Sequence, residues 1–293
     1  MILTISNSEI KVDINLIGAE ICSLKSHNTN IEYCWGGVKK IWGSTAPVLF
    51  PIIGALKDGY YLYEGKKYQV SKHGFIRNNN DLKILHHSTD ELRIGYQFSE
   101  ETKLKYPFEF DFQITFQLSG SKLLVKHKVF NLSVTKSMYF SLGGHPAFNC
   151  PFNKNERYDD YFLEFEKKET LNRWKVTKDG LLGTDSELFM ENSSCIHLTH
   201  DLFQDDALVF KKINSRKVHL KSNKSPNFLT IDYPDFNYLG IWAKPDGDFV
   251  CVEPWLGVTD AENTNHDFKT KDGIIEITPE GVYNASFSIE INE

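Results

Sequence analysis

Features of disulfide-rich, exported and membrane proteins are rare or missing in this sequence. Its 293 residues include only five cysteines, which are scattered and never form a Cys-x-x-Cys pair. That pattern argues against a disulfide framework and against a zinc knuckle. The N-terminus has neither a basic region nor a long apolar stretch, so it does not resemble a signal peptide. We therefore expect reduced thiols and a soluble, cytoplasmic protein.

Long apolar runs and excess positive charge are also missing. The most apolar window, residues 46–56, contains Pro47, Pro51 and Gly54, and it is far shorter than the ~20 residues that span a bilayer. The formal net charge is −6, so the chain lacks the broad basic surface that binds phosphate backbones. The composition argues against nucleic acid and membrane as partners.

Motifs for common cofactors and metals are absent from the sequence. There is no Gly-x-Gly-x-x-Gly, no Gly-x-x-x-x-Gly-Lys-Ser/Thr and no Gly-x-Ser-x-Gly, which mark dinucleotide, nucleotide triphosphate and esterase sites. No His-Glu-x-x-His pair occurs, and the adjacent His86 and His87 would point to opposite faces of a strand. We expect neither a metal nor a cofactor.

The residues that are abundant favour β-structure. The chain has 21 Phe and 13 Tyr, and aromatic side chains suit half-buried strands. From Phe110 to Leu118 every even position is apolar and every odd position polar, as in a strand with one wet face. A Ser-Gly-Ser turn and a second strand over residues 122–132 follow, which predicts a long antiparallel hairpin.

Short strand candidates recur along the chain, whereas helical periodicity is scarce. The further candidates are residues 60–63, 67–70, 92–98, 207–213, 218–220, 228–233 and 238–243. Two short helices are expected within 99–106 and 198–203, too short to connect parallel strands. No linker or repeat divides the chain. We predict one all-β domain over residues 1–293, a large antiparallel two-sheet sandwich with a few short helices.

Two histidines lie in local settings that suit chemistry. His73 follows a strand and precedes Arg77 by four residues, and imidazole and guanidinium groups both reach vicinal sugar hydroxyls. His145 follows an apolar strand and lies between two glycines and Pro146, which allows a tight turn and close ligand approach. The simpler alternatives are a solvated loop histidine and a turn histidine bonded to backbone carbonyls.

A lone carboxylate completes the candidate set. Glu253 ends the apolar run 249–252 and precedes Pro254 and Trp255. Burial there would raise the pKa of its carboxyl group above the model value of about 4.3 and make it a better base. Trp255 suits stacking on the apolar face of a sugar ring. The alternative is an edge-strand glutamate that faces water.

Five segments together resemble the aldose 1-epimerase family of galactose mutarotase-like proteins, and in particular its LacX-like bacterial branch. They are residues 46–54, 73–77, 142–149, 206–210 and 251–255. The resemblance implies a β-super-sandwich that interconverts the α and β anomers of a hexose without a cofactor. Glu253 would be the general base at the O1 hydroxyl and His145 the general acid at the ring oxygen. His73 would help hold that oxygen, with Arg77 and Asp206 contacting hydroxyls.

The chain departs from the family pattern at one position. Many relatives have arginine where this sequence has Ala55, so a cationic contact is missing unless Lys57 replaces it. This departure favours one alternative, a carbohydrate sensor that binds without turnover. A hexose-6-phosphate 1-epimerase is the nearest enzymatic alternative. Asp205 is an alternative to Asp206 as the sugar contact. The expected partner is a small sugar, and the expected state is a monomer or a homodimer.

Overall fold

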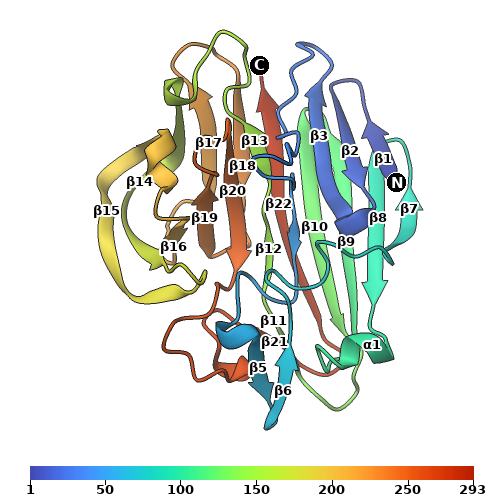
Figure 1. Ribbon diagram of the computed structural model, residues 1–293. Coiled ribbons are helices and arrows are strands. Elements are labelled where there is room, and N and C mark those ends of the chain that lie inside the picture. Colours follow the sequence, from blue (N-terminus) through green and yellow to red (C-terminus); the bar gives the residue numbers. More distant parts are fainter.

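Antiparallel β-structure dominates the molecule (Figure 1), as the sequence predicts. The computed structural model describes residues 1–293. Every pairing between its named strands is antiparallel. None of its helices has the length and apolar character needed to cross a bilayer.

One sheet of 15 strands forms the body of the fold. Its hydrogen-bonded order is β4-β12-β20-β19-β16-β14-β17-β18-β22-β10-β9-β8-β7, with β13 paired to β20 and β15 paired to β14. The strands are β4 (Val48–Leu49), β7 (Lys83–His87), β8 (Glu91–Gln97), β9 (Phe110–Ser119), β10 (Lys122–Asn131), β12 (Leu142–Gly144), β13 (Ala147–Asn149), β14 (Tyr161–Val176), β15 (Leu182–His197), β16 (Leu208–Phe210), β17 (Lys217–Ser222), β18 (Phe228–Asp232), β19 (Tyr238–Trp242), β20 (Phe249–Leu256) and β22 (Val282–Asn292).

Three smaller sheets and a few short helices complete the fold. The sheets are β1 (Ile2–Ser6), β2 (Ile10–Asn15) and β3 (Glu20–Ser26); β5 (Tyr60–Tyr63) and β6 (Lys66–Gln69); and β11 (Met138–Phe140) with β21 (Ile275–Ile277). The single α-helix is α1 (Glu100–Lys103), and 3₁₀ turns occupy Ile17–Ala19, Lys57–Gly59, Tyr158–Asp160, His200–Phe203 and Phe268–Thr270.

The predicted hairpin is present as β9 and β10, paired from Phe110↔Asn131 to Ser119↔Lys122. Its even-numbered β9 residues are buried, which confirms the alternation. The other predicted strands correspond to β5, β6, β8, β16, β17, β18 and β19, although β16 covers only three residues of the predicted 207–213. Both short helices occur, as α1 and the turn at His200–Phe203.

The sequence analysis missed the longest hairpin, β14 and β15. Each strand has 16 residues, and the pairing register shifts four times along their length. Bulges of this kind add an unpaired residue and reverse the inward and outward positions beyond it. The period of two that identifies a strand is therefore lost here.

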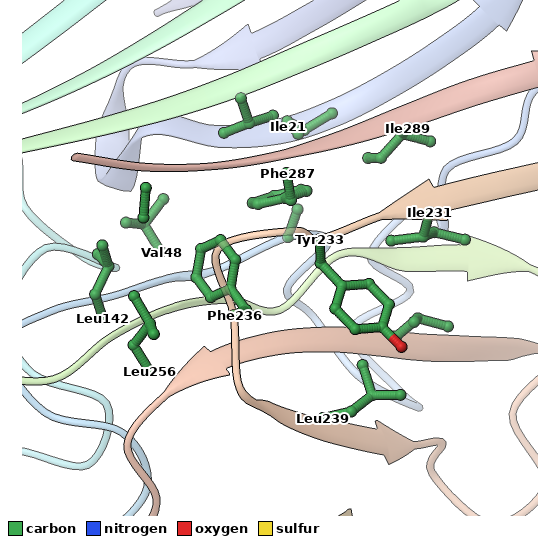
Figure 2. Close-up of a cluster of buried hydrophobic side chains, with 14 of the residues drawn as sticks. Ile21, Val48, Leu142, Ile231, Tyr233, Phe236, Leu239, Leu256, Phe287 and Ile289 are labelled. Carbon is green, nitrogen blue, oxygen red and sulfur yellow. The ribbon is translucent and has the colours of Figure 1, made fainter. Parts of the chain in front are cut away.

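The sheets share one hydrophobic core. A cluster of 67 buried residues extends from β1–β3 through the main sheet. Figure 2 shows one part of it, where Ile21 of β3, Val48 of β4, Leu256 of β20 and Phe287 of β22 gather in one cluster. The core therefore joins the first strands of the chain to the last.

A buried ion pair fastens three loops beside the main sheet. Lys271 Nζ lies 2.7 Å from Asp260 Oδ1, and each side chain is only 4% exposed. The other carboxylate oxygen accepts a hydrogen bond from the Lys57 backbone N–H at 3.0 Å. The Asp260 backbone pairs with Ala55 and Leu182. The side chain and backbone of Asp260 together thus connect the segments around residues 55, 182 and 271.

We predict that Asp260→Asn lowers the free energy of unfolding by about 3–5 kcal/mol, because it leaves the buried Lys271 ammonium without its counter-charge. Urea unfolding would measure the change. The matched control is Asp159→Asn, since Asp159 pairs with Arg157 at the surface with side chains 55% and 77% exposed. That variant should change stability by no more than about 0.5 kcal/mol. Equal losses in the two variants would refute the prediction.

Candidate functional site

A cavity of about 320 Å³ brings together all six residues singled out in the sequence. This volume lies in the range of small-molecule sites. The six residues are His73, Arg77, His145, Asp206, Glu253 and Trp255. The remaining lining residues are Ile41, Trp42, Pro47, Gly54, Lys72, Val176, Gly180, Ala207, Val209, Trp242, Lys244 and Thr259.

Strand register places His145 beside Glu253. Strands β12 and β13 both pair with β20, through Gly143↔Trp255 and Ala147↔Cys251. The position halfway between these two pairs puts His145 opposite Glu253. His145 Nε2 lies 3.3 Å from Glu253 Oε2. An acid and a base that are far apart in the sequence thus meet across one sheet.

Burial controls the protonation of this pair. Glu253 is 1% exposed and His145 9% exposed. Desolvation raises the pKa of Glu253 well above its ordinary value, although Trp255 and Lys72 oppose the rise. Desolvation lowers the pKa of His145 to about 3. Both shifts favour the uncharged forms, a carboxylic acid next to a neutral imidazole.

The tautomer of His73 follows from one backbone contact. The Gly54 N–H donates a hydrogen bond to His73 Nδ1 at 3.2 Å. The proton of the neutral ring therefore lies on Nε2, which is free to donate. Burial lowers the pKa of His73 well below its usual value, and the positive charges of Lys72 and Arg77 add to this effect. His73 is a neutral donor at physiological pH.

Tight backbone contacts hold His73 in place. Its φ is 66°, and Gly74 follows with φ of 80°. A Cβ atom at Gly74 would lie 1.9 Å from the carbonyl oxygen of Phe50. Only glycine permits this approach. The segments around residues 50–54 and 71–75 are thereby fixed against each other at the cavity wall.

The structure distinguishes the two neighbouring aspartates. Asp206 lines the cavity, and its carboxylate raises the pKa of Glu253. Asp205 is absent from the lining, and its Oδ2 lies 4.0 Å from Arg173 Nη2. Arg77 is half-buried, with its Nε unpaired and desolvation lowering its pKa. Asp206 and Arg77 therefore both lie in the cavity lining, whereas Asp205 does not.

Three of the five tryptophans line the cavity, although only Trp255 was singled out in the sequence. Trp42 stacks on the imidazole of His145 with ring centroids 5.1 Å apart, and Trp242 meets the same ring edge-on at 5.8 Å. The Trp255 indole lies over Gly240, where a Cβ atom would come within 2.5 Å of its ring. Trp42 and Trp242 carry no local motif that could have identified them.

A lysine lies close to the position where relatives often carry arginine. A Cβ atom placed on Gly180 would lie 3.7 Å from Lys72 Nζ and 3.8 Å from the Ala55 Cβ. Lys72 Nζ and Ala55 are therefore near the same point. Lys57 does not line the cavity, and its Nζ donates to the Glu262 carbonyl oxygen at 2.6 Å. Lys72 rather than Lys57 is therefore the cation nearest to Ala55 on the cavity side.

One group of residues has the donor types of a metal site. His145, Cys251 and Glu253 are all buried, and their donor atoms lie within 4.8 Å of one another. No sequence motif identifies this group, because its members come from two separate segments. Local His and carboxylate spacing, on which the expectation of no metal rested, does not detect donors that meet across a sheet.

Comparisons with known proteins agree on one family. The sequence profile described as aldose 1-epimerase matches residues 1–270. Protein LacX (plasmid) of Lactococcus lactis subsp. lactis is 28% identical over 299 residues, covering 99% of each chain. A galactose mutarotase related enzyme from Lactobacillus acidophilus is 35% identical, with a TM-score of 0.94 and coverage of 100% of this chain and 98% of that one.

A second solved structure is similar. A galactose mutarotase-like protein from Lactobacillus casei ATCC 334 is 31% identical, with a TM-score of 0.92 over 100% of both chains. These likenesses agree with the five sequence segments and with the antiparallel sheets. The chain belongs to the aldose 1-epimerase family.

Proposed function

We propose that this protein interconverts the α and β anomers of an aldose hexose, with Glu253 and His145 as the proton-transfer pair. The observation that carries the proposal is their 3.3 Å contact in a cavity of about 320 Å³. Mutarotation needs one group to take the O1 proton and another to protonate the ring oxygen. Both oxygens are bonded to C1, so the two groups must be neighbours.

The first step that we propose is a proton transfer within the protein. Burial favours a protonated Glu253 and a neutral His145. Transfer of that proton to His145 yields a carboxylate base and an imidazolium acid, and polar contacts from the sugar and the positive charge of Lys72 would help to stabilise the carboxylate. Their contact distance allows this transfer with little movement.

Ring opening then follows with balanced protons. The Glu253 carboxylate takes the O1 proton, a C1=O1 double bond forms, and the C1–O5 bond breaks. Its electron pair goes to O5, which takes the proton from His145. His73 Nε2–H supports O5 as negative charge develops. After rotation about C1–C2, closure on the other carbonyl face reverses both transfers.

We predict that Glu253→Gln lowers kcat by roughly 10²–10⁴-fold, the usual contribution of a positioned acid or base. The amide cannot accept the O1 proton but keeps the shape of the side chain. Polarimetry of fresh α-glucose or α-galactose, corrected for buffer, would measure the rate. Glu262→Gln, at an exposed glutamate outside the cavity lining, should retain full activity. Full activity in Glu253→Gln would exclude the mechanism, and a wild-type protein that binds sugar without accelerating exchange would be a sensor.

The pH dependence of kcat/KM should show that the pair of Glu253 and His145 is active when it carries one proton. Burial lowers the pKa of His145 to about 3 and raises that of Glu253, so the pair holds one proton between these limits. We predict that kcat/KM falls as pH rises through the raised pKa of Glu253, well above the ordinary carboxyl range. Stopped-flow polarimetry across pH would test this. A rate that rises through about pH 4.3 and has no alkaline fall would instead indicate a lone carboxylate base.

A phosphorylated hexose is the second candidate, because the cavity lining has more cations than carboxylates. The lining has three basic side chains, Lys72, Arg77 and Lys244. It has two acidic ones, Glu253 and Asp206, and Glu253 is neutral when protonated. Lys72 and Lys244 are exposed, which suits contact with a phosphate group that stays partly hydrated. A phosphate accepts charge-assisted hydrogen bonds from ammonium groups.

For this candidate we predict that Lys72→Ala and Lys244→Ala each raise KM for glucose 6-phosphate at least about tenfold relative to KM for glucose. A charge-assisted hydrogen bond is worth about 1.5–3 kcal/mol. Anomer exchange by NMR on the two sugars side by side would give the ratio. Lys57→Ala is the matched control, because Lys57 points away from the cavity. An unchanged ratio in both cavity variants would favour the free hexose.

A further inference from the structure

Cys251 is a buried nucleophile that the proposed mechanism does not use. It lies opposite Trp242 in the pairing of β19 with β20 and two residues before Glu253. Alternate residues of a strand share a face, so its thiol is on the side of Glu253. Its sulfur, one carboxylate oxygen and one nitrogen of His145 lie within 4.8 Å of one another.

Two of these three groups have unsatisfied buried atoms. Glu253 Oε2 and His145 Nδ1 have no hydrogen-bond partner, although both residues are at least nine-tenths buried. Buried polar atoms normally have partners, and an orphaned one often marks the place of a ligand or ion. The orphaned Oε2 is also the atom that faces His145.

From this geometry we propose that His145, Cys251 and Glu253 form a site for a thiophilic divalent cation, of which Zn²⁺ is the best match. Thiolate, imidazole and carboxylate are the three ligand types that zinc takes in proteins, at about 2.0–2.3 Å. Three protein ligands leave a fourth position open for water. Hard cations such as Mg²⁺ prefer all-oxygen sites, so the thiol selects against them.

The distances require only a small contraction. Tetrahedral ligands at those bond lengths lie about 3.5 Å from one another, and the imidazole and carboxylate are already 3.3 Å apart. Only the contacts to the sulfur must shorten, by up to about 1.3 Å from the 4.8 Å limit. The Glu253 side chain has three rotatable bonds with which to shorten its own contact.

Charge balance also favours the exchange. Metal ligands bind in their deprotonated forms, so a cation displaces the protons of the Cys251 thiol and the Glu253 carboxyl group. A cation M²⁺ would replace these two protons, giving thiolate, carboxylate and metal with two H⁺ released. The net charge of the buried site stays the same, which avoids the cost of burying an unpaired charge.

The segment that carries Ile41 and Trp42 covers the Cys251 sulfur. Cys251 is fully buried in a cluster with Trp35, Ala147 and Phe249, against which Trp42 and Ile41 pack. Trp42 also stacks on His145 and follows a segment with glycine at positions 36 and 37. A cation would therefore enter from the cavity, between His145 and Glu253, and reach the thiol last.

Metal binding would silence the proton-transfer pair. An imidazole nitrogen and a carboxylate oxygen that coordinate a cation cannot exchange protons with a sugar. We therefore expect Zn²⁺ to compete with substrate. This inhibition rests on the proposed function, whereas the binding itself does not, so the two are measured separately.

Cobalt provides the spectroscopic test on the chelator-treated full-length protein. Titration with Co²⁺ should give one equivalent bound, with a thiolate-to-cobalt charge-transfer band and up to two protons released in weak buffer. Addition of Zn²⁺ should abolish the band. Both Cys251→Ala and Cys251→Ser should lose the charge-transfer band and bind at least about tenfold more weakly, because one of three ligands is gone. Cys150→Ala, at another fully buried cysteine, should behave as wild type.

The outcomes are decisive even if a variant is unstable. Unfolding midpoints would identify a variant that does not fold, and the serine variant then replaces the alanine variant. Absence of the charge-transfer band in the wild type, or the same band in both Cys251 variants, would overturn the site. If cobalt binds as described but Zn²⁺ leaves anomer exchange unchanged, then the proposed role of Glu253 and His145 fails while the metal site stands.

Discussion

The antiparallel register of strand β20 is the constraint on which the site depends. All eight of its residues are buried, and β12, β13 and β19 pair with it. Alternation puts Phe249, Cys251, Glu253 and Trp255 on one face. A shift of one residue would turn the carboxylate into the core and replace it with Val252 or Pro254. The register of β20 therefore sets the positions of Glu253, His145 and Trp255 together.

Burying an acidic side chain in such a strand has an electrostatic cost. That cost is reduced when Glu253 and His145 are both neutral. Burial makes the neutral form of each group the more stable one, which means a protonated Glu253 and an unprotonated His145. The pair thus contributes no net charge to the interior until a ligand changes its environment. The ion pair of Asp260 and Lys271 differs, since its partners are close enough to stay charged together. This ion pair stabilises the wall of the cavity and is not part of the proposed proton-transfer pair.

The sequence predicts the fold where the period of two is intact and fails where it is broken. The hairpin from Phe110 to Asn131 follows from alternation and a Ser-Gly-Ser turn. The hairpin of β14 and β15 does not, because bulges interrupt its pairing. Most of the site was recognised from segments typical of one family. Trp42, Trp242 and Lys244 were missed, because such residues are common in any core or on any surface.

Gly240 shows how absent atoms can define a binding site. The Trp255 indole occupies the space that a side chain at position 240 would fill, and this lets the aromatic ring sink to the level of the sheet. Any larger residue at position 240 would clash with the Trp255 ring and displace it. The position of one ring in the cavity lining is thus set by the bare backbone of a neighbouring strand. A residue without a side chain therefore helps to shape the surface that a ligand meets.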